Sequence, residues 1–215
     1  MTAAERWASE LAAWAIPDHI MAQAPESPWV FTPALFRAPA EPGPDTPSRL
    51  RALQALPDRG SVLDVGCGGG AAGLALVPPA ARVTGFDQSE ELLALFTERA
   101  SELGGEQETV QGSWPDDAAL VGPADVVVCH HVAYNVPRLG AFAGELTSHA
   151  RARVVMELSG QHPRAGVNHL RETRVASIRR YLCLPAKRDP EIDALLGDEP
   201  GTPGETVTLW WAGTA

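Results

Sequence analysis

The sequence predicts an α/β fold in which helices cover both faces of a doubly wound, mostly parallel sheet. Short apolar runs separated by helical patterns recur along the chain at 61–66, 82–87, 107–112, 124–130 and 153–158. Continuous runs of this length are typical of parallel strands that are buried on both faces. The first run leads directly into a glycine-rich turn, as in the strand–turn–helix units of doubly wound sheets. Strands that alternate with helices in this way favour a single domain of this architecture.

An N-terminal helical and proline-rich arm is expected to precede the sheet. Thr2 and Glu5 have the spacing of a capping box, which predicts an amphipathic helix that ends before Pro17. Prolines then recur densely, but the apolar residues between them indicate a segment that packs on the domain rather than a free linker. We therefore divide the chain into an arm or lid, 1–47, and a domain, 48–215.

Helices are expected between the strands of the domain. The predicted helical segments are 48–56, 70–77, 89–103, a turn or two after Pro115, and 137–150. The segment 89–103 has the clearest boundaries, because Ser89 suits an N-cap, Glu90 suits the positive first turn and Gly104 suits the C-terminal end.

The last third of the chain is less regular than the centre. Its patterns predict helices over 171–184 and 190–196 and a final strand over 207–211, with a strand as the alternative for 171–184.

Charge and composition narrow the class of protein. The chain has 17 Lys and Arg against 27 Asp and Glu, a formal net charge of -10, which disfavours a nucleic-acid partner. No run approaches the ~18 apolar residues that a membrane span needs, and the amino terminus lacks the pattern of a secretory signal. The three cysteines are widely spaced and suit reduced thiols. These features predict a cytoplasmic protein that binds neither nucleic acid nor membrane.

The turn after the first strand has the residues of a loop that binds a nucleotide-type cofactor. The strand contains Asp64, and Gly66, Gly68 and Gly70 follow it directly. Asp87 ends the second strand seventeen residues beyond the last of these glycines. At this distance a neighbouring parallel strand presents a carboxylate to a ribose diol.

The same loop leaves one alternative open. Gly68, Gly70 and Gly73 also have the spacing of a dinucleotide fingerprint, which is typical of an NAD(P)-dependent oxidoreductase. A Gly-Lys-Ser/Thr sequence is absent and no lysine lies near the loop, so a phosphate site is not predicted.

The loop and its surroundings resemble a known family. Residues 64–70 match the Asp/Glu-x-Gly-x-Gly-x-Gly loop of class I S-adenosylmethionine-dependent methyltransferases, and Asp87 stands where that family has its ribose-binding acid. The resemblance continues through 111–114 and 124–131, covers about residues 61–160, and looks most like a group of small bacterial enzymes. It implies a Rossmann-like fold and an enzyme that uses S-adenosylmethionine and forms S-adenosylhomocysteine. A cofactor-binding scaffold without catalysis is a second alternative.

The resemblance implies cofactor contacts at the carboxyl ends of the first four strands. The glycines let the methionine and ribose lie against the turn, Asp87 accepts hydrogen bonds from the ribose hydroxyls, and Asp64 orients the loop or meets the ammonium group. Ser113 and Trp114 are expected beside the adenine, although the family commonly has an acid at the position of Ser113, and Trp114 as a core anchor is the alternative. The expected cofactor contacts are Asp64, Gly66, Cys67, Gly68, Gly70, Asp87, Gln88, Ser113, Trp114 and His130.

The loop after the fourth strand is expected to face the methyl acceptor, because open α/β sheets bind ligands at the carboxyl ends of their strands. We predict His131 and Tyr134 as catalytic residues and Asn135 as a substrate contact, with simple packing as the alternative for each. The Asn-Pro-Pro-Tyr and Pro-Cys motifs of nucleic-acid methyltransferases are absent. This absence favours a small-molecule acceptor, and no metal site is predicted.

The aromatic residues of the arm suggest a lid. Trp14, Trp29 and Phe31 are predicted to contact the substrate from above, and the alternative is that they seal the sheet edge or a dimer contact. The sequence leaves both a monomer and a homodimer open.

One departure from the family concerns the segment after the fifth strand. Only about a dozen residues, 160–172, precede the next helical pattern, and a parallel crossover needs at least that many for itself. Relative to the family, a helix and a strand are expected to be missing there.

Overall fold

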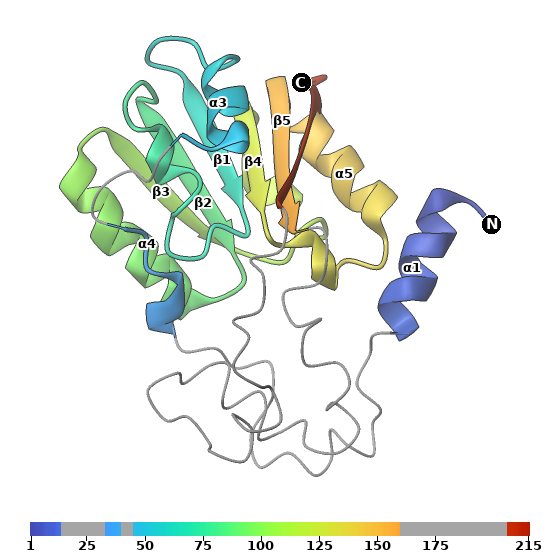
Figure 1. The fold of residues 1–215 in the computed structure, drawn as a ribbon. Coiled ribbons are helices and arrows are strands. Elements are labelled where there is room, and N and C mark those ends of the chain that lie inside the picture. Colours follow the sequence, from blue (N-terminus) through green and yellow to red (C-terminus); the bar gives the residue numbers. More distant parts are fainter. Residues whose placement is uncertain (14–32, 40–44, 160–205) are drawn as a thin grey trace, which may run out of the picture.

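The computed structural model describes residues 1–13, 33–39, 45–159 and 206–215 (Figure 1). Its centre is a six-stranded sheet with the strand order β3-β2-β1-β4-β5-β6. The strands are β1 (Ser61–Val65), β2 (Arg82–Asp87), β3 (Glu106–Gln111), β4 (Ala124–His130), β5 (Ala150–Ser159) and β6 (Thr206–Ala212).

The sheet is parallel except for its last strand. β6 pairs antiparallel with β5, whereas each of the other neighbouring pairs is parallel. The strand order runs in opposite directions from β1, so that the switch point lies between β1 and β4. This confirms the predicted Rossmann-like, mostly parallel α/β fold. β5 begins earlier than predicted because Ala150 already pairs with Ala124 of β4.

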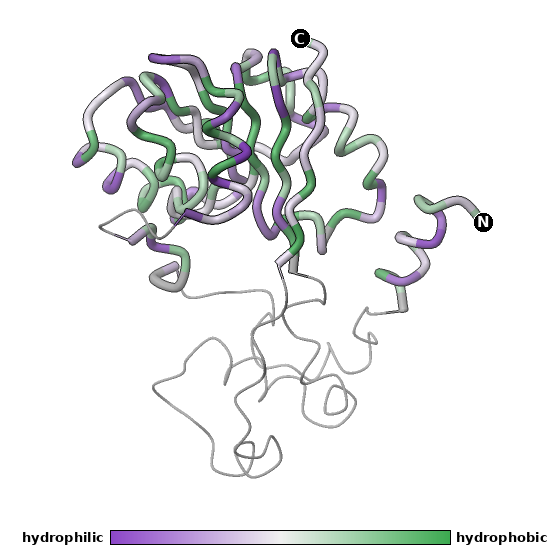
Figure 2. The backbone as a smooth tube through the Cα atoms, turned by 45° about the horizontal axis from the view of Figure 1, so that its top comes forward, coloured by the Kyte–Doolittle hydropathy of each residue, from purple (hydrophilic) through white to green (hydrophobic). Residues whose placement is uncertain are grey.

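Helices cover both faces of the sheet and enclose two cores (Figure 1). The helices are α1 (Ala3–Ala13), α3 (Pro47–Leu53), α4 (Glu90–Leu103) and α5 (Leu139–Ser148). α3 and α4 cover one face, where Phe96 is fully buried, and α1 and α5 lie on the other face, where Phe142 is fully buried. Figure 2 shows the hydrophobic backbone segments gathered along the central strands between these layers.

Two predicted helix starts are confirmed by their caps. The backbone N–H of Glu5 donates to Thr2 Oγ1 at 3.2 Å, and the N–H of Thr2 donates to Glu5 Oε2 at 2.7 Å. Ser89 Oγ accepts from the N–H of Leu92 at 3.3 Å at the start of α4. These side chains pair N–H groups that the first turn of a helix leaves without partners.

The predicted helix over 70–77 is wrong. Turns lead there into one 3₁₀ turn, Leu74–Leu76. The N–H of Gly73 donates to the carboxylate of Asp64 at 2.7 Å instead of to a helical carbonyl, and Pro78 stops any continuation.

Two smaller predictions differ from the structure, and a third, the turn after Pro115, is present in it. α3 ends at Leu53 rather than at residue 56, since the chain turns there toward β1. β3 is an edge strand that is half exposed, so the expectation of burial on both faces is wrong for it. The turn expected after Pro115 is the 3₁₀ turn Ala118–Leu120. The predicted helices at 171–184 and 190–196 and the short connection at 160–172 lie outside the described residues.

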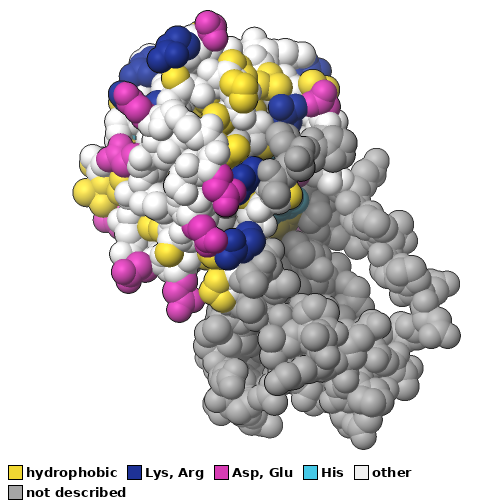
Figure 3. All heavy atoms as spheres, turned by 90° about the vertical axis from the view of Figure 1, so that its left-hand side faces the viewer, with side chains coloured by type: hydrophobic (Ala, Val, Ile, Leu, Met, Phe, Trp, Pro, Cys, Tyr) yellow, Lys and Arg dark blue, Asp and Glu magenta, His cyan; other side chains and the backbone are white. Residues whose placement is uncertain are grey.

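The surface carries charges of both signs side by side. On the face drawn in Figure 3, acidic and basic side chains are interspersed. Ion pairs among the described residues include Arg37 with Glu98 and Arg82 with Glu106. Among the residues described, none of the helices is long and apolar enough to cross a bilayer.

Candidate cofactor and acceptor site

The glycine turn after β1 is held against the end of β2 by backbone hydrogen bonds. The N–H groups of Gly66 and Cys67 both donate to the carbonyl of Phe86, at 2.8 and 3.2 Å. Gly66 has a φ of +70°, and a Cβ there would lie 2.3 Å from Val132 Cγ2. Glycine is therefore required at 66 both by backbone conformation and by the approach of the loop after β4.

Asp64 orients the turn from inside the core. Its side chain is buried, and its Oδ2 accepts from the N–H of Gly73 at 2.7 Å. Burial raises the pKa of this carboxyl to about 7, the hydrogen bond from Gly73 opposes the rise, and the charge of Asp87 adds to it. The loop-orienting contact proposed for Asp64 is thus present, and its contact with the cofactor's ammonium group stays a prediction.

Asp87 closes the other side of the turn. The carboxylate lies at the end of β2 and is 9% exposed. It accepts from the N–H of Gly68 at 3.0 Å and from the N–H of Ser89 at 2.9 Å. A carboxylate has about four acceptor positions, so two hydrogen bonds leave capacity for a diol.

The C-terminal part of the arm is attached to the same turn, which sequence reasoning missed. The N–H of Gly69 donates to the carbonyl of Phe36 at 3.1 Å, and Arg37 forms a parallel bridge with Gly69. Arg37 also pairs with Glu98 of α4 at 2.9 Å. The apolar residues between the prolines indicated that the arm packs on the domain. They could not indicate where it attaches, because backbone pairing between distant segments leaves no pattern in the sequence.

His130, at the end of β4, has a buried polar atom without a partner. Among the described residues nothing hydrogen-bonds to its Nε2. Burial lowers the pKa of its imidazole to about 4, and this effect outweighs the charge of Glu157, which acts in the opposite direction. A buried polar atom without a protein partner is expected where a ligand supplies the missing hydrogen bond.

His131 and Tyr134, the predicted catalytic pair, are brought together. His131 Nδ1 lies 3.2 Å from Tyr134 Oη, and the two rings are stacked. His131 Nε2 lies 3.1 Å from Oε1 of Glu157, near the end of β5. Two of these three neighbouring residues are predicted from the sequence, whereas Glu157 is missed.

Glu157, in β5, links the loop after β4 to α3. Its Oε2 accepts a hydrogen bond from the hydroxyl of Ser48 in α3. Hydrogen bonding to His131 lowers the pKa of Glu157 to about 2, and this exceeds the opposing effect of burial, with Ser48 contributing in the same direction. The sequence did contain a signal for Glu157, because it is an acidic residue near the end of an otherwise apolar run, Val154 to Leu158.

The residues expected beside the adenine are placed differently from one another. The Trp114 ring packs edge-on against Phe86 and His149, and its Nε1 lies 3.4 Å from the carbonyl of Phe142. These contacts agree with the core-anchor alternative for Trp114, and its contact with the adenine stays a prediction. Ser113 is exposed, and its N–H donates to Asp117 at 2.8 Å.

The other predicted contacts have simpler surroundings. Gln88 is exposed, and its carbonyl accepts from Gln111 at 3.1 Å. Cys67 is buried, and burial raises the pKa of its thiol, which stays protonated. Asn135 lies in a 3₁₀ turn, Ala133–Asn135, after β4.

The predicted lid is described only at its two ends. Trp14, Trp29 and Phe31 lie outside the described residues. In α1, the Nε1 of Trp7 donates to the carbonyl of Val136 at 2.8 Å. The arm therefore contacts the loop after β4 at one end and the glycine turn at the other.

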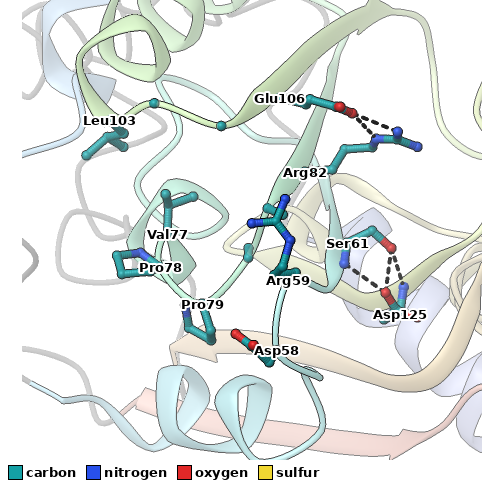
Figure 4. Close-up of a pocket in the computed structure, with 14 residues that line it drawn as sticks. Asp58, Arg59, Ser61, Val77, Pro78, Pro79, Arg82, Leu103, Glu106 and Asp125 are labelled. Atoms are coloured by element: carbon teal, nitrogen blue, oxygen red, sulfur yellow. Dashed lines mark hydrogen bonds and ion pairs between the residues drawn. The ribbon is translucent and has the colours of Figure 1, made fainter.

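A cavity of about 810 Å³ lies at the opposite edge of the sheet (Figure 4). Its lining comes from the amino ends of the strands, including Ser61, Arg82, Glu106 and Asp125. Among these, Arg82 pairs with Glu106 at 2.7 Å, and Asp125 accepts from the hydroxyl of Ser61 at 2.8 Å. Doubly wound sheets bind ligands at their carboxyl edge, so this cavity is not assigned to the cofactor.

The strand order, the glycine turn after β1 and the acid at the end of β2 define an α/β protein with a nucleotide-type cofactor site at the switch point. Residues 62–153 match the family model described as a methyltransferase domain. This part of the chain is a methyltransferase domain of the class I, S-adenosylmethionine-dependent type.

Several proteins of known class are similar to this domain. Ribosomal protein L11 methyltransferase of Gloeobacter violaceus is 32% identical over 125 residues, which are 52% of this chain and 39% of that protein. Ubiquinone biosynthesis O-methyltransferase of Cronobacter sakazakii is 42% identical over 77 residues, 35% of this chain and 32% of that protein. The chain thus matches less than two fifths of the length of these relatives.

A solved structure of magnesium protoporphyrin IX methyltransferase from Synechocystis PCC 6803 with bound SAH is also similar. It is 20% identical with a TM-score of 0.49, covering 71% of this chain and 73% of that one.

In the described parts of the chain, His, Cys, Asp and Glu side chains form no group of three that could hold a metal ion.

Proposed function

We propose that the chain transfers a methyl group from S-adenosylmethionine to a small-molecule acceptor. The observation that supports this most is the acid at the end of β2, Asp87, which is bonded to the N–H of Gly68 in the turn after β1. The methyltransferase family match over residues 62–153 points to the same cofactor.

The residues of the turn suit this cofactor. Asp87 retains acceptor capacity for the ribose hydroxyls, and His130 has a polar atom in need of a partner. The carboxyl group of Asp64, whose pKa burial raises to about 7, would ionise on meeting an ammonium group. Gly66 to Gly70 allow backbone to approach a ligand closely. When bound, S-adenosylmethionine supplies an electrophilic methyl group and leaves as S-adenosylhomocysteine.

The acceptor is assigned to the loop after β4. His131 and Tyr134 orient it or remove its proton, and Asn135 contacts it. The lid contact predicted for Trp14, Trp29 and Phe31, which lie outside the described residues, is part of this proposal. The net charge of -10 disfavours a nucleic acid in this position, and the relatives named for ubiquinone biosynthesis act in the synthesis of a small molecule.

Calorimetry tests the cofactor assignment against its alternatives. Wild-type protein is titrated with S-adenosylmethionine, S-adenosylhomocysteine, NADH and NADPH. We expect binding of the first two only, and binding of a nicotinamide cofactor alone contradicts the proposal. Cofactor binding without methylation of any small acceptor favours the scaffold.

A variant at Asp87 sharpens the test. Asp87→Ala removes hydrogen bonds from a charged acceptor, each worth about 1.5–3 kcal/mol, so cofactor affinity is expected to fall about 10–100-fold. Asp58→Ala, at the opposite edge of the sheet, is the matched control and is expected to bind normally. Unchanged affinity in Asp87→Ala contradicts the ribose assignment.

A further inference from the structure

We propose that Glu157 is a positioning residue that holds His131 as a general base, and that the methyl acceptor is therefore a hydroxyl compound. This inference rests on the proposed methyl transfer and adds to it the class of acceptor. It connects three elements that the sequence places far apart: α3, the loop after β4 and the end of β5.

A continuous chain of hydrogen bonds carries the proposal. Thr46 Oγ1 and Ser48 Oγ lie 2.9 Å apart at the start of α3, and the Ser48 hydroxyl donates to Glu157 Oε2. The other oxygen, Oε1, lies 3.1 Å from Nε2 of His131, whose Nδ1 lies 3.2 Å from Tyr134 Oη. Both oxygens of Glu157 are thereby fixed, and the imidazole is fixed at both of its nitrogens.

Burial decreases along this chain toward the acceptor loop. Ser48 is fully buried, the Glu157 side chain is 13% exposed, and the His131 side chain is 50% exposed. The carboxylate is therefore shielded from water while the imidazole can reach a substrate. A base supported from behind by a buried acid is the arrangement by which hydrolytic triads orient their histidine.

The charge of Glu157 sets the tautomer of His131. The carboxyl, with its pKa lowered to about 2 by the hydrogen bond from His131, is ionised at neutral pH and can only accept hydrogen bonds. Nε2 of His131 must then carry the hydrogen, which leaves the lone pair of the neutral ring at Nδ1, where it can accept from the hydroxyl of Tyr134. Nδ1, on the side of Tyr134, is thus the nitrogen that can take a proton.

Neighbouring titratable groups do not replace His131 in this role. His130 also influences Glu157 electrostatically, but burial lowers its pKa to about 4, so it is neutral at physiological pH. Ser48 is neutral, and the phenol of Tyr134 faces the opposite nitrogen of the ring. Among the described residues that influence Glu157, His131 is the one whose ring lies between the carboxylate and the hydroxyl of Tyr134.

The backbone of His131 is also unusual. Its φ is +59°, a left-handed conformation that is unfavourable for a residue with a side chain. The N–H of His131 donates to the carbonyl of Glu157 at 2.8 Å, which holds this conformation against β5. Strained backbone of this kind is concentrated at functional sites.

The chemistry of such a base selects the acceptor. As the acceptor oxygen uses a lone pair to form the new O–CH₃ bond, the S–CH₃ bond breaks with its electron pair on sulfur. The hydroxyl proton passes to Nδ1 of His131, and the resulting imidazolium is paired with Glu157. A tertiary amine or a thioether has no proton to lose, so this arrangement would serve it no purpose.

The tautomer of His131 tests the positioning role without any substrate. In ¹⁵N NMR spectra of histidine-labelled protein, assigned with His131→Gln, wild type is expected to show the Nε2–H tautomer. Glu157→Gln is expected to abolish that preference, and Ser48→Ala to weaken it. Glu145→Gln, which alters the Glu145–His149 pair at 3.8 Å on α5, is the matched control and should leave His131 unchanged. An unchanged His131 tautomer in Glu157→Gln overturns the positioning role.

Paired acceptors test the hydroxyl assignment. Transfer of labelled methyl from S-adenosylmethionine is measured to catechol and 3,4-dihydroxybenzoate, and to the diamines of the same two skeletons. We expect transfer to the phenols, with kcat about 100-fold lower and an altered pH profile in Glu157→Gln, and an unchanged KM for S-adenosylmethionine. Methylation of the amines alone, or of neither kind of probe, overturns the hydroxyl assignment.

The two proposals fail in distinguishable ways. If calorimetry detects no binding of S-adenosylmethionine to wild type, methyl transfer itself is refuted. If the cofactor binds and transfer is equal in wild type and in Glu157→Gln, only the role of Glu157 is refuted.

Discussion

The carboxylate of Asp87 accepts a hydrogen bond from the backbone N–H of Gly68 at 3.0 Å, which joins the end of β2 to the turn after β1. The acid is therefore fixed before any ligand arrives, with a second hydrogen bond from Ser89 at the start of α4. A preformed acceptor loses little conformational entropy on binding, which favours affinity.

Asp64→Asn is expected to stabilise the protein at alkaline pH. Because burial raises the pKa of Asp64 to about 7 from an ordinary 3.8, the folded state holds its proton more tightly than the unfolded chain. Stability is therefore lost as pH rises from about 4 through 7, and an amide, which still accepts from Gly73, avoids this loss. Urea denaturation at pH 5 and pH 8 measures this change in the free energy of unfolding. The same change with pH in wild type and Asp64→Asn would refute a raised pKa of Asp64.

Glu157→Gln is expected to lower stability at neutral pH but not in acid. The folded-state pKa of about 2 lies below the ordinary 4.5, since His131 and Ser48 hydrogen-bond to the ionised carboxyl. Its contribution is fully present above about 4.5 and is lost as pH falls toward 2. Thermal unfolding at pH 7 and pH 3, with the exposed Glu108→Gln as control, should show a gap that narrows in acid only for Glu157→Gln.

His130→Gln is expected to make stability less sensitive to mild acid. Burial lowers the pKa of His130 to about 4 from an ordinary 6.5, so the unfolded chain binds a proton between these values while the folded state does not. Wild type therefore loses stability as pH falls from about 6.5 to 4, and the variant lacks this contribution. Denaturation series over this pH range measure the slopes, and equal slopes contradict the burial of a neutral ring.

Gly66→Ala is expected to destabilise the fold by about 2–4 kcal/mol. The φ of +70° costs a residue with a Cβ about 1–2 kcal/mol, and the clash with Val132 adds a comparable overpacking term. Val132→Ala in the same chain should recover the second part. Gly144→Ala, in α5 with open space around its Cβ, is the control and should gain about 0.5–1 kcal/mol. Chemical denaturation compares all four proteins.

Residues that act through local pattern could be predicted from the sequence. Capping by Thr2 and Ser89, the apolar runs of the strands and the glycines after β1 depend on neighbours within a few positions, and the structure confirms these elements. The helix expected at 70–77 failed because a distant carboxylate, Asp64, takes the N–H of Gly73.

Some contacts on the acceptor side of the proposed site could not be predicted from local sequence patterns. His131 and Tyr134 are three residues apart and could be paired from the sequence. Glu157 and Ser48 contact each other across 109 positions, through a parallel pairing of β4 with β5 and the packing of α3. Sequence periodicity reflects only neighbours along the chain, so a contact between such distant residues becomes visible only in the folded structure.

Substitution of Gly69 offers a way to detach the arm while leaving the glycine turn after β1 intact. Its φ lies in the range open to any residue, unlike those of Gly66, Gly68 and Gly70, yet a Cβ there would lie 2.2 Å from the carbonyl oxygen of Phe36. A single methyl group at this position would therefore push away residues 36 and 37 without forcing the turn itself into a disallowed shape. The dependence of turnover on the arm can thus be separated from its dependence on the loop.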